Sequence, residues 1–556
     1  MPKRQWADGV VNVLTFSDIS NTHEFVRANR RRLLGEDLER NAINFPERVA
    51  LHDVKSGWKL TYREFESRVN HVAHALLKRG IGRGDRICML GRNHVDTLTM
   101  YFAVCRMGAI LVPLNYNSNA EELRYIIDDA QPKAAALSIE FVDRIDKAVF
   151  AGLDLFTYGP VADSGDLGGW VAPTHTPAPD IALDDRAPAF ILYTGGTTGR
   201  PKGVVQCQGG YLTMADNTVH ALAPLGFGRT DSWLVSGPLY HGAALAYSVT
   251  GLHYAQTVHL LPQFDVDEVL AAIGQGFGTV TWFIPTMSRR IVDRVVAKGL
   301  DPAAIEGLRL IISAGAPLSI ALRQLLRKTF RKSQVVDIVG QTELTSTIIA
   351  HGEPADIEGD PTAVGYPVPG MTVALLDDAN QLVAPGQVGE LCYKSDCLML
   401  GYWNKPDVTQ EAMAGGWFHS GDLATRSPDG LIHIVGRKKE LIKSGGENII
   451  PNEIEDVLKR VPGIGDACVI GIRDDHWGER VHAVLAIGEG GDADALRKAG
   501  EAACREKLSR YKVPKTWTVL ASLPFNAVGK SDKAKIKALV EAGGDRFDLR
   551  PQQVGV

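Results

Sequence analysis

The sequence predicts an α/β protein: a large N-terminal domain built from several α/β subdomains, one of them β-rich, followed by a small mobile α/β domain. Its length of 556 residues is too great for a single hydrophobic core. Amphipathic helical segments alternate with short apolar runs along most of the chain, which favours α/β layering. The composition changes after about residue 389, where short strand-like runs separated by glycine turns indicate the β-rich part.

Hydrophobic periodicity predicts the elements of the first half. Apolar residues recur with helical spacing over 61–79, and Gly80 ends this helix. The expected elements that follow are a strand at 85–90, a helix at 95–107 and strands at 109–114, 233–239, 280–284 and 308–313. The segment 158–187 is rich in proline, glycine and aspartate and predicts a long surface connection.

The last third predicts the second domain. Strands are expected at 389–393 and 431–435, and the charged stretch 436–440 is a polar break after them. A compact α/β unit follows, with a helix at 451–460, strands at 467–472 and 481–487, and a helix at 492–508. We therefore place the boundary near Lys439, giving domains 1–438 and 439–556.

Composition narrows the class of protein. Apolar residues make up 45% and charged residues 22%, as in ordinary globular proteins. The net charge of −5 and the lack of a long basic block argue against nucleic-acid binding. The basic cluster 30–32 is interpreted as a solvated helix face. The start lacks the apolar segment of a signal peptide, and the most apolar segment, 101–114, is too short to span a bilayer.

The seven cysteines are dispersed and odd in number, which argues against a disulfide framework and favours a reducing cytoplasm. Cys392 and Cys397 are close in sequence, but no second Cys/His pair nearby completes a zinc set. The sequence gives no signal for oligomeric state, so a homodimer is only the general expectation.

The most informative segment is 191–203, which reads ILYTGGTTGRPKG. An apolar strand ends in a loop with glycines, threonine hydroxyls and one lysine. Glycines allow backbone N–H groups to face an anion, hydroxyls add donors, and Lys202 adds a charge suited to phosphate. A Walker loop is excluded because Pro201 separates the glycines from Lys202. The segment therefore predicts a nucleotide-phosphate loop.

This segment resembles the phosphate loop of the adenylate-forming enzymes, which include acyl- and aryl-CoA ligases, luciferases and the adenylation domains of peptide synthetases. Gly195 stands where that family usually has serine. Seven further segments resemble family motifs and occur in the family's order between about residues 40 and 540.

The resemblance implies an ATP site. Small residues at 313–318 would pack on adenine. In the separate segment 337–343, Val339 stands where the family has an aromatic residue that stacks on adenine. Asp422 would accept the ribose hydroxyls. The implied ATP- or AMP-binding residues are Thr194, Gly195, Gly196, Thr197, Thr198, Gly199, Lys202, Gly315, Ala316, Pro317, Asp337, Val339, Gly340, Gln341, Thr342, Asp422, Arg437, Lys443, Asn448 and Lys530. Magnesium bound to phosphates takes one or two protein ligands, and Glu343 with Thr197 would supply them.

The resemblance also implies an acyl pocket and a coenzyme A path. His241 would lie between the carboxylate site and the thiol entrance. The implied acyl-pocket residues are Tyr240, His241, Gly242, Ala243, Ala244, Phe283, Ala314 and Gly340. Ser444, Gly445 and Gly446 would border the pantetheine arm of coenzyme A, and Lys439 would be the hinge between the domains.

The implied reaction is the ATP-dependent conversion of a carboxylic acid to an acyl-adenylate, followed by transfer to coenzyme A. The implied catalytic residues are Lys530, Glu343, Thr342, His241 and Lys202, with ATP, Mg²⁺ and coenzyme A as cofactor and co-substrates. Small residues and nearby aromatics favour an apolar, medium-sized aliphatic, cyclic or aromatic acid. Two alternatives stay open: an amide ligase in which an amine captures the adenylate, and a non-catalytic nucleotide-binding relative.

Overall fold

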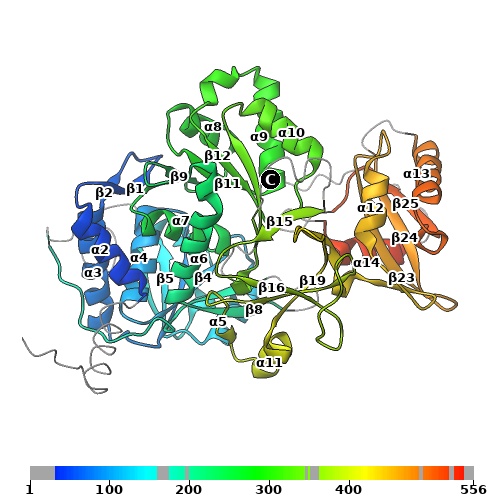
Figure 1. Cartoon of the computed structure of the whole chain (residues 1–556). Helices are drawn as coiled ribbons and strands as arrows, with labels where there is room; N and C mark the ends of the chain where they lie inside the picture. The colour runs from blue at the N-terminus through cyan, green and yellow to red at the C-terminus, as the bar shows by residue number, and fades with distance from the viewer. Residues whose placement is uncertain are drawn as a thin grey trace, which may run out of the picture.

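The described part of the chain forms three β-sheets with helices packed on them. The computed structural model describes residues 32–159, 175–194, 200–344, 349–350, 362–487, 492–524 and 531–543. Figure 1 shows the C-terminal elements gathered on one side of the molecule, apart from the two larger sheets. The predicted α/β class, with a large N-terminal part and a small C-terminal unit, is confirmed.

The first sheet is the longest. Its order is β16 (Thr372–Leu376), β17 (Gly389–Lys394), β19 (Phe418–Arg426), β20 (Ile432–Arg437), β15 (Ala363–Pro367), β14 (Ile349–Ala350), β13 (Gln334–Val339), β12 (Leu310–Ser313), β11 (Val280–Phe283), β9 (Ser232–Val235), β10 (Thr257–Leu260), β1 (Val49–Asp53) and β2 (Lys59–Thr61). The six strands from β13 to β1 run parallel. The strands from β16 to β14 pair antiparallel and form the expected β-rich part.

The second sheet carries the phosphate-loop segment. Its order is β18 (Gly401–Tyr402), β8 (Lys202–Cys207), β7 (Pro188–Thr194), β4 (Ile110–Leu114), β3 (Arg86–Leu90), β5 (Ala134–Ser138) and β6 (Asp154–Tyr158). Strands β7 and β8 form an antiparallel hairpin at the edge of the parallel strands. The loop of this hairpin is the glycine- and threonine-rich segment.

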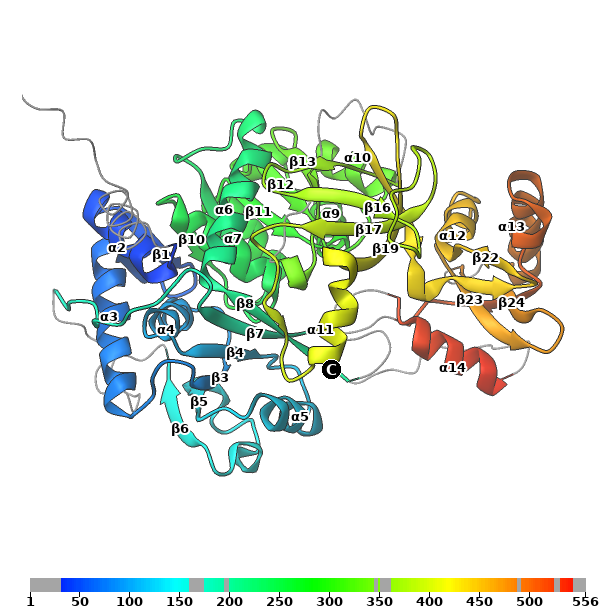
Figure 2. The ribbon, with the colours of Figure 1, turned by 60° about the horizontal axis from the view of Figure 1, so that its bottom comes forward.

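Helices cover both large sheets in layers. One apolar cluster joins residues of α3 (Tyr62–Lys78), α4 (Val95–Arg106), α6 (Gln208–Leu222) and α7 (Gly242–His253) with both sheets, so these helices lie between them. The outer face of the first sheet packs against α8 (Val266–Gly274), α9 (Pro285–Lys298) and α10 (Ile320–Thr329). The outer face of the second sheet packs against α5 (Ala120–Ala130), as Figure 2 shows from another side. The remaining helices of this part are α2 (Leu34–Asn44) and α11 (Pro406–Ala412).

The small third sheet has the order β22 (Glu447–Ile449), β21 (Ile442–Ser444), β24 (Gly478–Ala486) and β23 (Asp466–Asp474), with β25 (Thr516–Leu520) paired to β24. Helices α12 (Pro451–Lys459), α13 (Ala493–Lys507) and α14 (Lys533–Gly543) complete this unit. It meets the first sheet where Ile450 packs on Gly436: a Cβ at Gly436 would lie 2.6 Å from the Ile450 side chain. None of the described helices is long and apolar enough to cross a membrane.

Most expected elements are confirmed, with two differences. The strand expected at 233–239 ends at Val235, because Gly237 and Pro238 turn the chain toward α7. Strand β20 continues to Arg437, so the expected polar break is reduced to one 3₁₀ turn, Lys438–Glu440. Residues 175–187 contain no helix or strand, as expected, while 160–174 lie outside the described residues.

Candidate active site

The candidate site lies where four parallel strands of the first sheet end. Because β9, β11, β12 and β13 run parallel, the loops that follow them meet at one edge of the sheet. These loops carry His241, Ala314 to Pro317, and Gly340 to Glu343. The fold therefore brings together three segments that the sequence analysis had proposed for one site.

The phosphate-loop hairpin reaches the same place. Thr194 and Lys202 face each other across its mouth, with the Thr194 hydroxyl 3.5 Å from the Lys202 carbonyl oxygen. On β8, the Gln206 side-chain amide donates to the Thr342 carbonyl oxygen, which ties the hairpin to the loop after β13. The loop residues Gly195, Gly196, Thr197, Thr198 and Gly199 lie outside the described residues.

Glu343 is held in place by a residue that the sequence analysis missed. The Tyr402 hydroxyl donates to Glu343 Oε1 at 2.9 Å, and burial together with the Glu343 charge raises the pKa of Tyr402. Lys202 Nζ lies 4.9 Å from the centre of the Tyr402 ring. Tyr402 thus links the expected phosphate lysine to the expected magnesium ligand. A tyrosine far along the chain, on the short strand β18, gives no chemical signal of this role in the sequence.

These side chains suit Mg²⁺. Tyr402 engages one oxygen of the half-buried Glu343 carboxylate, so the other oxygen can face a metal ion bound to phosphates. The second expected ligand, Thr197, lies outside the described residues. Thr342, which precedes Glu343, also lies near the start of α7: a Cβ placed on Gly242 would lie 4.0 Å from the Thr342 hydroxyl oxygen.

Asp422 has partners on both carboxylate oxygens. Gln341 Nε2 donates to Oδ2 at 2.8 Å, and Arg437 Nε lies 2.9 Å from Oδ1. Asp422 and Arg437 are opposite each other on β19 and β20. The expected ribose acceptor is therefore oriented by two other expected site residues, and ribose hydroxyls would join or replace these donors.

The Asp337 carboxylate is engaged by another side chain. Its carboxylate forms an ion pair with Arg323 of α10, and burial raises its pKa to about 6 in spite of that partner. We therefore assign Asp337 to the packing of α10 on β13 rather than to nucleotide contact. Its neighbour Val339 is partly buried and packs against the cluster that contains Leu344 and Met399.

The loops after β12 and β13 leave several expected residues accessible. Gly315 has φ of +89°, a conformation that favours glycine, and is exposed. Pro317 and Gly340 are exposed as well, while Ala316 is half-buried. These positions leave backbone atoms open at the edge where adenine is expected.

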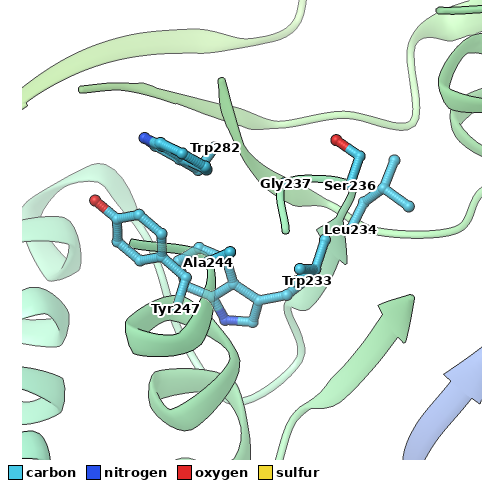
Figure 3. Close-up of a pocket in the computed structure, with 8 residues that line it drawn as sticks. Trp233, Leu234, Ser236, Gly237, Ala244, Tyr247 and Trp282 are labelled. Carbon is cyan, nitrogen blue, oxygen red and sulfur yellow. The ribbon is translucent and has the colours of Figure 1, made fainter. Parts of the chain in front are cut away.

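An aromatic wall stands beside His241. The His241 ring stacks on Trp282 with centroids 5.8 Å apart and an interplanar angle of 21°. Trp282 neighbours Tyr247 at 6.2 Å, and Tyr247 stacks on Trp233 at 5.2 Å. Figure 3 shows Trp282, Gly237 and, together on α7, Ala244 and Tyr247 among the residues that line a small cavity.

His241 begins α7 as well as facing this wall. Its Nδ1 accepts the Ala243 backbone N–H at 3.3 Å, an N-cap interaction. Small residues belong to the same region: Ala243 and Ala314 are half-buried at the margin of the central cluster, and a Cβ at Gly242 would lie 3.5 Å from Leu192. His241 therefore has both a structural role and an orientation toward the expected acyl pocket.

Two expected acyl-pocket residues are corrected. Successive strand residues face opposite sides of a sheet. Trp282 therefore points to the central side and forms part of the aromatic wall, while Phe283 is buried in the outer cluster near Phe264. Tyr240 packs edge-on against Tyr116 at 5.2 Å rather than against Trp282. We therefore replace Phe283 by Trp282 in the acyl wall and place Tyr240 at its margin.

The C-terminal residues of the expected site lie on one hairpin. Lys443 and Asn448 face each other on β21 and β22, and both are exposed. Gly445 and Gly446 form the two-residue turn with φ of +61° and +85°, and Ser444 before them is buried. Lys439 is exposed in the 3₁₀ turn before this hairpin, and Lys530 lies outside the described residues.

Comparison with known proteins agrees with this arrangement. Residues 38–403 match the model of the AMP-binding enzyme family, and residues 453–530 match the model of the AMP-binding enzyme C-terminal domain. The chain is 33% identical to a feruloyl-CoA synthase of Amycolatopsis sp, over 91% of this chain and 99% of that protein. It is 32% identical to an indoleacetate–CoA ligase of Aromatoleum aromaticum, over 92% of this chain and 97% of that protein.

Solved structures agree as well. ATP-bound MatB from Rhodopseudomonas palustris superposes with a TM-score of 0.82 at 28% identity, covering 92% of this chain and 99% of that one. The amide bond synthetase McbA from Marinactinospora thermotolerans superposes with a TM-score of 0.80 at 25% identity, covering 91% and 99%. The chain belongs to the AMP-binding enzyme family and is an adenylate-forming enzyme.

Proposed function

We propose that the chain is an ATP-dependent ligase that joins an apolar aromatic monocarboxylic acid to coenzyme A. The reaction has two halves: the acid and ATP give an acyl-adenylate and pyrophosphate, and the thiol then displaces AMP. Family membership and relatives that are acid–CoA ligases along nine-tenths of the chain support both halves. The observation that carries the substrate class is the stacked wall of His241, Trp282 and Tyr247.

The first half brings two anions together, so positive charge must offset their repulsion. Lys202 at the hairpin mouth and Lys530 on the C-terminal unit supply side-chain charge. Bound through Glu343, Mg²⁺ would neutralise phosphate charge during pyrophosphate departure. The proposed hydroxyl donor to the α-phosphate is Thr342, whose backbone is tied to the hairpin through Gln206. Gln341 and Arg437 orient Asp422 for the ribose.

The second half needs the C-terminal unit in another position. The two domains 1–438 and 439–556 rotate about Lys439, which removes Lys530 and brings the Gly445–Gly446 turn toward the adenylate. The exposed 3₁₀ turn that holds Lys439 supports this, because a short exposed connection can change its backbone angles without disturbing a core. A thiol with a pKa near roughly 8.5 needs little help to react.

The acyl wall favours a flat ring over a flexible chain. Aromatic faces attract other rings in stacked or edge-on arrangements worth about 0.5–1.5 kcal/mol beyond burial. Small residues at 242–244 leave room beside the wall, and none of the described residues lining its small cavity is charged. The relatives named for ferulic and indoleacetic acids support an aromatic substrate.

An amide ligase is the second candidate, because the amide bond synthetase McbA shares the fold over nine-tenths of the chain. In that case an amine would capture the same adenylate. For the location we keep the cytoplasm as a proposal, supported by seven buried cysteines that are all free. We also keep a homodimer as the expected assembly.

A product assay tests the function. Arylacetic, arylpropenoic and benzoic acids are compared with straight-chain acids of similar size and with dicarboxylic acids, each with coenzyme A or with a panel of amines. We expect thioester formation with at least one aromatic class at a kcat/KM about tenfold or more above the straight-chain acids. Preference for dicarboxylates would refute the substrate class, and amide products without thioesters would favour the second candidate.

A further inference from the structure

A cluster of three different metal-binding side chains lies on β17 and β19. Glu390 and Cys392 are two residues apart on β17 and point to the same face, and His419 is paired directly with Cys392 across the sheet. His419 Nδ1 lies 3.0 Å from Glu390 Oε2 and 3.4 Å from Cys392 Sγ, and all three atoms lie within 4.8 Å of one another. We propose that Glu390, Cys392 and His419 form a binding site for a zinc-type divalent metal ion.

The spacing fits tetrahedral coordination. Zinc bonds of about 2.0–2.3 Å at a tetrahedral angle place neighbouring ligand atoms roughly 3.3–3.6 Å apart. The distances from the histidine nitrogen differ from these values by only a few tenths of an ångström. Thiolate and imidazole ligands select zinc-like ions, whereas magnesium prefers oxygen ligands. The site is therefore distinct from the expected magnesium position at Glu343.

The atoms that would not bind the metal are already held by the surrounding chain. His419 Nε2 lies 3.2 Å from the Ala414 carbonyl oxygen, which leaves Nδ1 directed at the cluster. Glu390 Oε1 accepts the Gly421 N–H at 3.1 Å, which leaves Oε2 directed at the cluster. Such outer contacts orient ligands in known metal sites. Two paired strands supply all three ligands, and their pairing register shifts between Glu390 and Cys392.

The ammonium group of Lys438 lies beside the cluster and is paired with Glu390. Lys438 Nζ lies 3.0 Å from Glu390 Oε2 and 2.8 Å from Asp378 Oδ1. The Asp378 side chain is 90% exposed and the Lys438 side chain is 41% exposed. The Lys438 ammonium group can therefore break its contact with Glu390, keep its ion pair with Asp378, and so give solvent access to the cluster. The pKa of Asp378 is lowered by its hydrogen bond from Lys438, by the charge of Lys438 and by the charge of Lys443. Asp378 or water would complete the coordination.

Metal binding would affect two neighbouring segments, the one that contains Lys438 and Lys439 and the one that contains Gly421 and Asp422. The metal replaces the Cys392 thiol proton, which is released to solvent, and it replaces Lys438 as the partner of Glu390. Lys438 directly precedes Lys439, and Glu390 also holds the backbone of Gly421 beside Asp422. The zinc site therefore lies between the proposed hinge and the expected ribose acceptor, but its existence does not depend on the proposed reaction.

The test is metal titration of the full-length, metal-stripped protein with Zn²⁺ and with Co²⁺ as a spectroscopic probe. We expect one bound ion per chain and a thiolate-to-cobalt charge-transfer band. Cys392→Ser abolishes that band, and His419→Gln weakens binding by about tenfold or more. The control Cys397→Ser, which removes a buried thiol only five residues away, leaves the band unchanged.

Lys438→Met gives the sharpest result, because this half-exposed residue is not needed for folding of a core. Removing the competing ammonium is expected to tighten Zn²⁺ binding several-fold. The proposal is overturned if the band persists in Cys392→Ser, if no stoichiometric binding occurs, or if Lys438→Met binds no more tightly than the unaltered protein. Should Cys392→Ser fail to fold, His419→Gln and Lys438→Met decide the matter on the same titration.

Discussion

Tyr402 is the residue whose role at the site is clearest from the structure alone. Its hydroxyl holds one oxygen of Glu343, and its ring lies beneath Lys202. We expect Glu343→Gln to lower the rate of ATP–pyrophosphate exchange by on the order of 10²–10³, because a preorganised charge is lost. Tyr402→Phe removes only the orienting hydrogen bond, so a smaller loss is expected.

Steady-state exchange measured over a range of Mg²⁺ concentrations checks this pair. Glu343→Gln should need more Mg²⁺ for half-maximal rate, whereas Tyr402→Phe should shift that concentration less. Equal effects of the two variants would show that Glu343 acts only through its contact with Tyr402.

Trp282 and Phe283 form a natural matched pair, because they are adjacent on β11 and face opposite sides of the sheet. Trp282→Leu should raise KM for an aromatic acid by about tenfold and leave KM for ATP unchanged, since a stacking surface is lost. Phe283→Leu should lower the free energy of unfolding by about 1–2 kcal/mol without changing the KM for the acid. Kinetics and denaturant unfolding of both variants check this, and a reversed pattern would contradict the assigned acyl wall.

This pair also shows what the sequence could not predict at the residue scale, namely which of two adjacent strand residues faces the site. Strand β11 is buried on both faces, so it has no polar alternation to reveal which residues face the site. The phosphate loop, its lysine and the ribose acceptor are proposed from the sequence alone, because their chemistry is local in the sequence. Tyr402 and Gln206 could not, since their roles depend on contacts between distant segments.

At the scale of elements, an ion-pair network joins three helices of the N-terminal part. His253, the last residue of α7, lies 2.8 Å from Asp37 of α2 and 3.0 Å from Asp216 of α6. Burial alone would lower the pKa of His253, but hydrogen bonds to Asp216 and Asp37 outweigh it and raise the pKa to about 9. The charged histidine therefore stabilises the contact of these helices.

The pH dependence of stability follows from this shift. Because the folded pKa of about 9 exceeds the usual 6.5, the stabilisation is complete below pH 6.5 and is lost as the pH rises through 9. We expect about 3 kcal/mol of unfolding free energy to be lost over this range and the loss to be absent in His253→Gln. Urea unfolding of both proteins at pH 6 and pH 10 measures it, and parallel losses in the two proteins would contradict this origin.

The turn between β21 and β22 offers another matched comparison. Gly445 and Gly446 both have positive φ, but a Cβ at Gly445 would lie 2.8 Å from the Trp477 ring, whereas a Cβ at Gly446 meets nothing within 4 Å. Gly445→Ala should therefore destabilise the hairpin by about 1 kcal/mol more than Gly446→Ala. Thioester formation from supplied adenylate should fall further in Gly445→Ala, and thermal unfolding of both variants separates stability from catalysis.

Periodicity predicted elements well where capping and patterning agree. The helix expected at 61–79 is α3, which begins after Thr61 because Thr61 and Glu64 form a capping box. The strand expected at 233–239 was too long, because Gly237 and Pro238 turn the chain before the apolar Leu239. Hydrophobicity therefore located this strand but not its end.

At the scale of the whole molecule, two units carry the expected site residues. The first two sheets carry Lys202, Glu343, His241 and Asp422, while the third sheet and its helices form the unit after the proposed hinge (Figure 1). The sequence predicted a small second unit from the polar break at 436–440 and the α/β pattern after it, yet it could not predict that the β-rich strands extend the parallel sheet through β14. Pairing between strands so far apart along the chain leaves no local pattern.

The central claim is that the two halves of the reaction use different positions of the C-terminal unit, with Lys530 serving only the first. The most direct measurement compares Lys530→Ala with the unaltered protein in ATP–pyrophosphate exchange and in thioester formation from a supplied acyl-adenylate. Exchange should fall by on the order of 10²–10³ while thioester formation stays nearly unchanged. Equal loss of both activities would contradict the account.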